Sequence, residues 1–155
     1  MIQLSKTTIE DLETLFILQT DKESIWMAAF TPEDPNDKTR YLEKWARIVD
    51  NPEIRMQTIR TDDKIVGSVI HFDVMNETNV SYWIDRAFWG KGIATEALRQ
   101  FINGTEKRPL FGRVAHDNKG SQRVLEKCGF QSITLERGFA NARQMEIEEF
   151  VYRLD

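Results

Sequence analysis

A glycine-containing turn in the middle of the chain has residues suited to binding an anion. A run rich in β-forming residues from Val80 to Ile84 leads into Gly90-Lys91-Gly92, and apolar residues with helical spacing follow as far as Ile102. The first N–H groups of a helix have no internal partner, and the helix dipole adds partial positive charge there. Small residues let a phosphate group approach the backbone. The segment therefore predicts an anion site built mainly from main chain, with a turn that binds nothing as the simpler alternative.

Three kinds of phosphate-binding turn can be compared with this segment. A P-loop requires Gly-Lys-Ser/Thr so that a hydroxyl can coordinate Mg²⁺, but Gly92 follows Lys91. A dinucleotide-binding turn requires a third glycine where Thr95 stands, inside an early β-α-β unit that is not predicted here. The remaining interpretation is a cradle for the diphosphate of coenzyme A. A nucleotide-binding protein that holds ATP on the same turn stays open as an alternative.

Composition limits the partners that we expect. The chain has 155 residues, of which 41% are apolar and 30% charged, and this predicts a single domain over residues 1–155. Lys and Arg number 21 against 25 Asp and Glu, so the net charge is −4. A general nucleic-acid binder usually has a basic surplus. No stretch approaches the roughly 18 consecutive apolar residues that span a bilayer. We therefore expect neither a nucleic-acid nor a membrane partner.

The cysteine and histidine content predicts neither disulfides nor a metal site. Cys128 is the only cysteine, and the N-terminus lacks a secretory pattern, so the expected compartment is the cytoplasm. We expect Cys128 to be buried on a short helix and unreactive. His71 and His116 are far apart and match no metal-ligand spacing, so no metal cofactor is expected.

Hydrophobic periodicity predicts the elements that position the turn. A short first strand should precede a helix from Thr7 or Thr8, where Thr7 and Glu10 have capping-box spacing. The polar segment 31–37 should be a loop between helices, either a plain connection or a mobile loop beside a cleft. Further helices are expected over 39–50, from 93 to 103 and over 121–128, and strands over 56–60, 64–72, 80–84, 109–115, 131–136 and 147–154.

This order of elements predicts the fold class. Strands paired by hairpins, with a turn at 75–78, are followed by β-α-β crossovers. Such an arrangement favours an α/β (α+β) fold with a mixed, mostly antiparallel sheet and helices on both faces.

Two segments resemble the GCN5-related N-acetyltransferase (GNAT) superfamily. The sequence Trp89-Gly-Lys-Gly-Ile-Ala-Thr-Glu-Ala97 is similar to its acetyl-CoA motif, and Asn118-Lys-Gly-Ser-Gln-Arg-Val-Leu-Glu-Lys-Cys-Gly-Phe130 resembles its Asn-x-x-Ser/Ala … Lys-x-Gly-Phe segment. The sequences Tyr82-Trp83-Ile84 and Trp89-Gly90-Lys91-Gly92 are most similar to the branch of ribosomal-protein N-terminal acetyltransferases. The resemblance implies a GNAT-like acyl-CoA N-acyltransferase fold over nearly the whole chain. It also implies transfer of an acetyl group from acetyl-CoA to a primary amine, in a ternary complex.

The resemblance assigns cofactor contacts to particular positions. The motif Gln/Arg-x-x-Gly-x-Gly/Ala falls on Trp89, Gly92 and Ala94, with Trp in place of the usual Gln or Arg. Backbone groups of the turn would contact the diphosphate, and Lys91 would either add charge or be a solvated side chain. A main-chain amide of Trp83 or Ile84 would polarise the acetyl carbonyl. The full set of implied cofactor-binding residues is Trp83, Ile84, Trp89, Gly90, Lys91, Gly92, Ile93, Ala94, Thr95, Asn118 and Ser121.

Two positions that usually hold catalytic groups in this family are changed. The tyrosine acid seven residues after Asn118 is replaced by Leu125, and the branch that the chain resembles implies Ser121 as the proton donor to the thiolate. Water could supply that proton instead, and Asn118 could simply cap a helix. The glutamate base is replaced by Asn79. A water chain or one of four nearby residues remains as the base: Asp73, Glu77, Asp85 and His71, the last of which could be structural.

The changed positions leave a second function open, a non-catalytic acyl-CoA-binding module. The acceptor amine is not identified by the sequence, and a small molecule or a peptide N-terminus would both fit. Trp26, Met27 and Phe30 correspond to the region that shapes the acceptor site in the family. A homodimer is possible.

Overall fold

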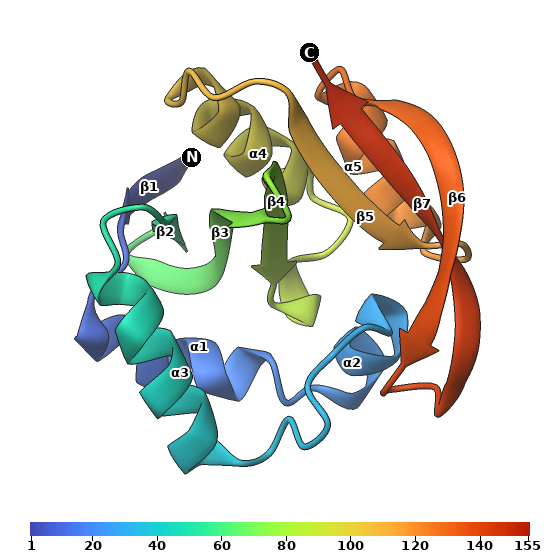
Figure 1. Cartoon of the computed structure of the whole chain (residues 1–155). Helices are drawn as coiled ribbons and strands as arrows, with labels where there is room; N and C mark the ends of the chain where they lie inside the picture. Colours follow the sequence, from blue (N-terminus) through green and yellow to red (C-terminus); the bar gives the residue numbers. More distant parts are fainter.

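Seven strands form one sheet in the computed structural model, which describes residues 1–155 (Figure 1). The strand order is β1-β2-β3-β4-β5-β7-β6, and only β4 and β5 run parallel. This confirms the predicted mixed, mostly antiparallel sheet. The strands are β1 (Ile2–Lys6), β2 (Arg55–Thr61), β3 (Lys64–Val74), β4 (Glu77–Ile84), β5 (Leu110–Ala115), β6 (Gln131–Ala140) and β7 (Met145–Leu154). The helices are α1 (Leu12–Leu18), α2 (Lys22–Ala28), α3 (Lys38–Asp50), α4 (Ile93–Asn103) and α5 (Lys119–Lys127), with short 3₁₀ turns at Ile9–Asp11 and Arg86–Phe88.

Two tight hairpins build the β2-β3-β4 part of the sheet. Asp62 and Asp63 join the first pair of strands, and Met75 and Asn76 join the second. All four residues have positive φ angles, between 50° and 68°, as a two-residue type I′ turn requires. β4 therefore starts at Glu77, and the predicted turn over 75–78 is too long by two residues.

Helices pack on both faces of the sheet because its strands alternate their side chains. Val69 and Ile70 are neighbours on β3, yet they belong to different clusters of buried residues. Val69 lies in the main core with Leu98 and Phe101 of α4, and all three side chains are inaccessible to solvent. Ile70 lies in a second core, against which residues of α1 and α3 pack. The main core therefore fixes α4, the helix that follows the glycine turn.

α2 is a helix that the sequence analysis did not predict. It has only seven residues, and its one buried side chain is the polar Ser24, so the sequence has no apolar stripe that would predict it. Asp21 caps its first turn, because Oδ2 accepts hydrogen bonds from the Ser24 backbone N–H (3.0 Å) and from its hydroxyl (2.8 Å). The loop 31–37 follows it and connects it to α3, as expected of a loop between helices.

The first helical turn is also capped differently from the prediction. The Thr8 backbone N–H donates to Asp11 Oδ2 (3.1 Å), so the capping pair is Thr8 and Asp11 rather than Thr7 and Glu10. Thr7 is buried instead, and its hydroxyl accepts a hydrogen bond from Thr58 of β2 at 2.9 Å.

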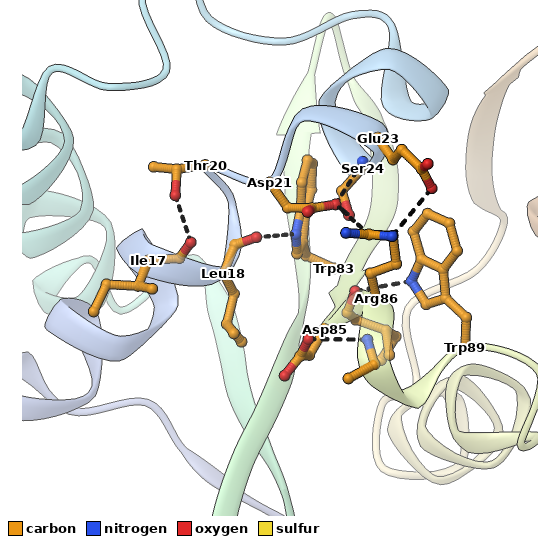
Figure 2. Close-up of polar contacts among 12 residues, drawn as sticks. Ile17, Leu18, Thr20, Asp21, Glu23, Ser24, Trp83, Asp85, Arg86 and Trp89 are labelled. Carbon is orange, nitrogen blue, oxygen red and sulfur yellow. Dashed lines mark hydrogen bonds and ion pairs between the residues drawn. The ribbon is translucent and has the colours of Figure 1, made fainter.

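Polar contacts attach α2 to the rest of the molecule (Figure 2). Arg86, directly after β4, pairs with Asp21 (2.9 Å) and with Glu23 (3.3 Å). The Trp83 indole of β4 fixes the end of the preceding helix, α1, because its N–H donates to the Leu18 carbonyl at 3.2 Å. At the other end of α2, Arg143 from the β6-β7 turn donates to the Trp26 carbonyl at 2.9 Å. The position of α2 is therefore set by side chains from distant parts of the chain.

No helix combines the length and apolar character needed to cross a membrane. No three His, Cys, Asp or Glu residues are grouped so that they could hold a metal ion.

His71 is a buried histidine that gives the fold a predictable response to acid. Its ring packs edge-on against Phe101 (5.7 Å between centroids), and its Nδ1 atom has no hydrogen-bond partner. Burial, with smaller contributions from Lys107 and Arg55, lowers the pKa of His71 below its ordinary value of 6.5. The unfolded chain therefore takes up this proton first, and stability falls as the pH drops below about 6.5.

We expect His71→Phe to reduce this loss of stability, because the aromatic contact remains while the titrating group is removed. The measurement is the urea-unfolding free energy of both proteins between pH 7.5 and pH 5. The exposed His116 provides a control, since His116→Gln should follow the wild-type curve. Parallel curves for His71→Phe and wild type would contradict this account.

Candidate active site

β4 and β5 separate soon after they pair. Their parallel register contains only Thr78 opposite Leu110 and Asn79 opposite Phe111. From Val80 to Ile84, β4 still pairs with β3 but has no partner on the β5 side. A strand edge inside a sheet therefore has no strand partner, and its outward N–H groups are available to a ligand.

The alternation of backbone groups identifies which amide faces this gap. The Asp85 N–H donates to the Val66 carbonyl of β3 at 2.7 Å. Successive residues of a strand direct their backbone groups to opposite edges, so those of Ile84 face away from β3. The Trp89 indole reaches the Ile84 carbonyl from that side, at 3.0 Å. Of the two amides predicted to polarise a carbonyl, the one on Ile84 faces the gap, while that of Trp83 faces β3.

The glycine turn leads directly into α4. Gly90 and Gly92 have φ angles of 76° and 75°, a left-handed conformation that glycine adopts with least strain. An added Cβ at either glycine would meet no atom within 4 Å, so the backbone there borders open space. The first hydrogen bond of the helix runs from the Glu96 N–H to the Gly92 carbonyl (3.1 Å). The N–H groups of residues 93–95 are consequently free of helical partners.

The N-terminus of α5 lies on the other side of the gap. Asn118 caps this helix, since its Oδ1 accepts a hydrogen bond from the Ser121 N–H at 3.2 Å. Its Nδ2 donates to the Met27 carbonyl of α2 at 3.3 Å. Asn118 therefore caps the helix, which is the structural role that the sequence analysis left open for it. The same residue fastens α2 against the site.

A pocket of about 450 Å³ occupies the space between these elements. Every predicted cofactor-binding residue except Lys91 lines it: Trp83, Ile84, Trp89, Gly90, Gly92, Ile93, Ala94, Thr95, Asn118 and Ser121. The Lys91 ammonium lies 5.2 Å from the centre of the Phe88 ring and belongs to the surface beside the pocket. The two segments that resemble family motifs, 89–97 and 118–130, thus both contribute residues to one cavity.

Several lining residues were not singled out from the sequence. Arg123 and Lys127 are four residues apart, which puts both cations on one face of α5, and both line the pocket. The four-residue spacing of these two cations could have predicted that they share one face of the helix. Ser24 and Ala28 line it from α2, and no pattern marked them because that helix was not predicted. Met27 lines the pocket as well, whereas Trp26, Phe30 and the loop 31–37 do not.

No carboxylate or imidazole lines the pocket, so the candidate bases lie elsewhere. His71 packs against α4 in the main core. Asp73 accepts a hydrogen bond from Thr78 at 2.7 Å, and Asp85 caps the 3₁₀ turn by accepting from the Ala87 N–H (3.1 Å). Glu77 begins β4, at its paired end. Leu125, where a tyrosine would stand, is buried in the main core.

Two hydroxyl groups meet on the wall of the pocket. The Tyr82 hydroxyl of β4 donates a hydrogen bond to Ser121 Oγ of α5 at 2.8 Å. Burial raises the pKa of Tyr82 to about 12, so its phenol stays protonated at neutral pH. Cys128 caps the end of α5 and is half-buried rather than buried as expected, and burial raises the pKa of its thiol.

Comparison with known proteins places the chain among acetyltransferases. Residues 2–131 match the family model described as Acetyltransferase (GNAT) domain. The chain is 33% identical over 85 residues to the probable N-acetyltransferase YjcK of Bacillus subtilis (strain 168), a match that covers 50% of this chain and 47% of that protein.

Solved structures show the same fold. The microcin C7 self-immunity acetyltransferase MccE, in complex with acetyl-CoA and AMP, superposes with a TM-score of 0.81 at 20% identity and covers 99% of this chain and 91% of its own. The ribosomal L7/L12 α-N-protein acetyltransferase RimL, in complex with coenzyme A, gives 0.78 at 15% identity and covers 97% and 93%. The family match over residues 2–131 shows that the chain belongs to the GNAT acetyltransferases.

Proposed function

We propose that this chain transfers the acetyl group of acetyl-CoA to a primary amine, as a single domain over residues 1–155 in the cytoplasm. The observation that carries the proposal is that the unpaired edge of β4 and residues 93–95, whose N–H groups are free, line the same pocket. A pantetheine arm fits a strand-like gap, and a diphosphate fits a helix N-terminus behind a glycine turn. The cations Arg123 and Lys127 add charge complementary to the diphosphate.

The backbone of β4 would serve the chemistry. The amide of Ile84 would donate to the acetyl carbonyl and stabilise negative charge as it develops on that oxygen. The Trp83 side chain would line the pocket, with its indole held in place by a hydrogen bond to the Leu18 carbonyl.

Transfer would follow from direct attack by the neutral amine. The nitrogen forms a bond to the carbonyl carbon and the C–S bond breaks, which leaves the amide and a thiolate. The amine gives up one proton to water, because no carboxylate or imidazole lines the pocket. The sulfur receives one proton from Ser121, which regains it from solvent, and no covalent enzyme intermediate forms.

The acceptor would enter from the side of α2, where Ser24, Met27 and Ala28 line the pocket. A peptide N-terminus is favoured by the resemblance to ribosomal-protein acetyltransferases, and a small amine is the other candidate. The rival function, an acyl-CoA-binding module without activity, draws on the replacement of the usual acid and base by Leu125 and Asn79.

Release of free thiol from acetyl-CoA tests the proposed function. The purified chain is supplied with a peptide that has a free N-terminal alanine and, separately, with spermidine. We expect turnover with at least one of them. If water takes the amine proton, kcat/KM should level off near the α-amino pKa of about 8 for the peptide and keep rising past pH 9 for spermidine.

Two outcomes would contradict parts of this account. An inflection near pH 6 to 7 shared by both acceptors would indicate a base on the enzyme. Tight acetyl-CoA binding without turnover of any amine would favour the binding module.

Substitution at Gly92 tests the diphosphate cradle. We expect Gly92→Glu to weaken coenzyme A binding roughly 100-fold, since a carboxylate would face the diphosphate at short range. Gly92→Ala is the matched control, because it carries the same strain at a φ angle of 75° without the charge. Calorimetric titration measures both variants, and competition should show that coenzyme A displaces ATP. Equal affinities for the two variants would overturn the cradle.

A further inference from the structure

We propose that Tyr82 is a positioning residue for Ser121, whose only hydroxyl hydrogen it leaves free for the thioester sulfur. The proposal rests on the proposed function and adds a residue to it. Tyr82 donates to Ser121 Oγ at 2.8 Å, and both residues line the pocket. The bond joins β4 to α5 across the gap between β4 and β5.

The hydrogen-bonding capacity of serine makes this contact consequential. A serine hydroxyl has one hydrogen to donate and two lone pairs with which to accept. In a helix it can donate to a carbonyl three or four residues earlier, and this would consume the hydrogen; because Ser121 is the third residue of α5, the helical carbonyl in question is that of Asn118. Ser121 makes no such bond here, and its Oγ accepts from Tyr82 instead. Occupying a lone pair with a tyrosine proton therefore keeps the serine hydrogen available to the pocket.

The surroundings hold the phenol in the donor state. The Tyr82 side chain packs against the main core, and the Ser121 backbone N–H is fixed by the Asn118 side chain. Burial raises the pKa of Tyr82 to about 12, so the phenol keeps its proton over the usual working range of pH. A chain of two hydroxyl groups in a partly buried site also polarises the second O–H bond, which favours donation to a developing thiolate.

The substitution Tyr82→Phe removes this hydroxyl and retains the aromatic ring. We expect kcat for the better of the alanyl peptide and spermidine to fall about tenfold, the value of one hydrogen bond lost from the transition state. The KM for acetyl-CoA should change little, because the cradle is untouched. If Tyr82 acts through Ser121, Ser121→Ala should lower kcat at least as much, and the double variant should be no slower than Ser121→Ala.

Tyr152 supplies a matched control. Its hydroxyl also donates to α5, to Glu126 Oε2 at 2.9 Å, but Tyr152 does not line the pocket. Tyr152→Phe should therefore leave kcat unchanged, while the melting temperatures of both tyrosine variants report any general loss of stability.

The outcomes separate this proposal from the function on which it rests. Wild-type turnover with an unchanged kcat in Tyr82→Phe would overturn the role of Tyr82 and leave the acetyltransferase function intact. Additive losses in the double variant would show that Tyr82 does not act through Ser121. Acetyl-CoA binding without wild-type turnover of either amine would overturn the function and the positioning role together.

Discussion

The separation of β4 from β5 after two residue pairs is the constraint on which the candidate site depends. Unpaired backbone groups inside a sheet cost free energy unless a ligand or water satisfies them. Here the unpaired edge opens into a pocket whose far end is the N-terminus of α4. The gap and the helix terminus thus present main-chain donors along one path. A long thioester carrier with an anionic end matches that path in shape and in charge.

The main core makes this arrangement rigid. Leu98 and Phe101 of α4 are fully buried against the sheet, so the first turn of the helix cannot shift without disturbing the interior. Gly90 and Gly92, which follow β4 and the 3₁₀ turn Arg86–Phe88, then allow the chain to reverse direction into α4. The proposed binding by backbone groups would also allow the side chains of the turn to differ from the usual family pattern, as Trp89 does.

Much of this fold could be predicted because its signals are local. The periodic apolar pattern from Ile93 to Asn103 predicted α4, and two glycines before it predicted the turn. Boundaries were less accurate where pairing decides them, as at β4, which begins three residues before its run of β-forming residues. α2 was missed because Ser24 is its only buried side chain, so burial there follows from polar contacts that form only in the folded chain.

The site was predictable to the extent that it follows motifs. The glycine turn and Asn118 with Ser121 occur in segments of recognisable spacing, and the structure brings them to one pocket. The contact between Tyr82 and Ser121 joins residues 39 positions apart and depends on how α5 packs, which no spacing reveals. Spacing also fails to reveal Ser24 and Ala28, which line the proposed acceptor side of the pocket from α2.

α2 is held by side chains that bind its main chain or its capping residue: Arg86 at one end, and Asn118 and Arg143 at the other. Apart from Glu23, which pairs with Arg86, and Trp26, whose ring lies under Arg143, these contacts place few demands on the identity of the helix's own outward side chains. Its sequence can therefore drift during evolution at little expense to folding. Preference for one amine over another could then change by substitutions in α2, while the grip on the acyl donor stays the same.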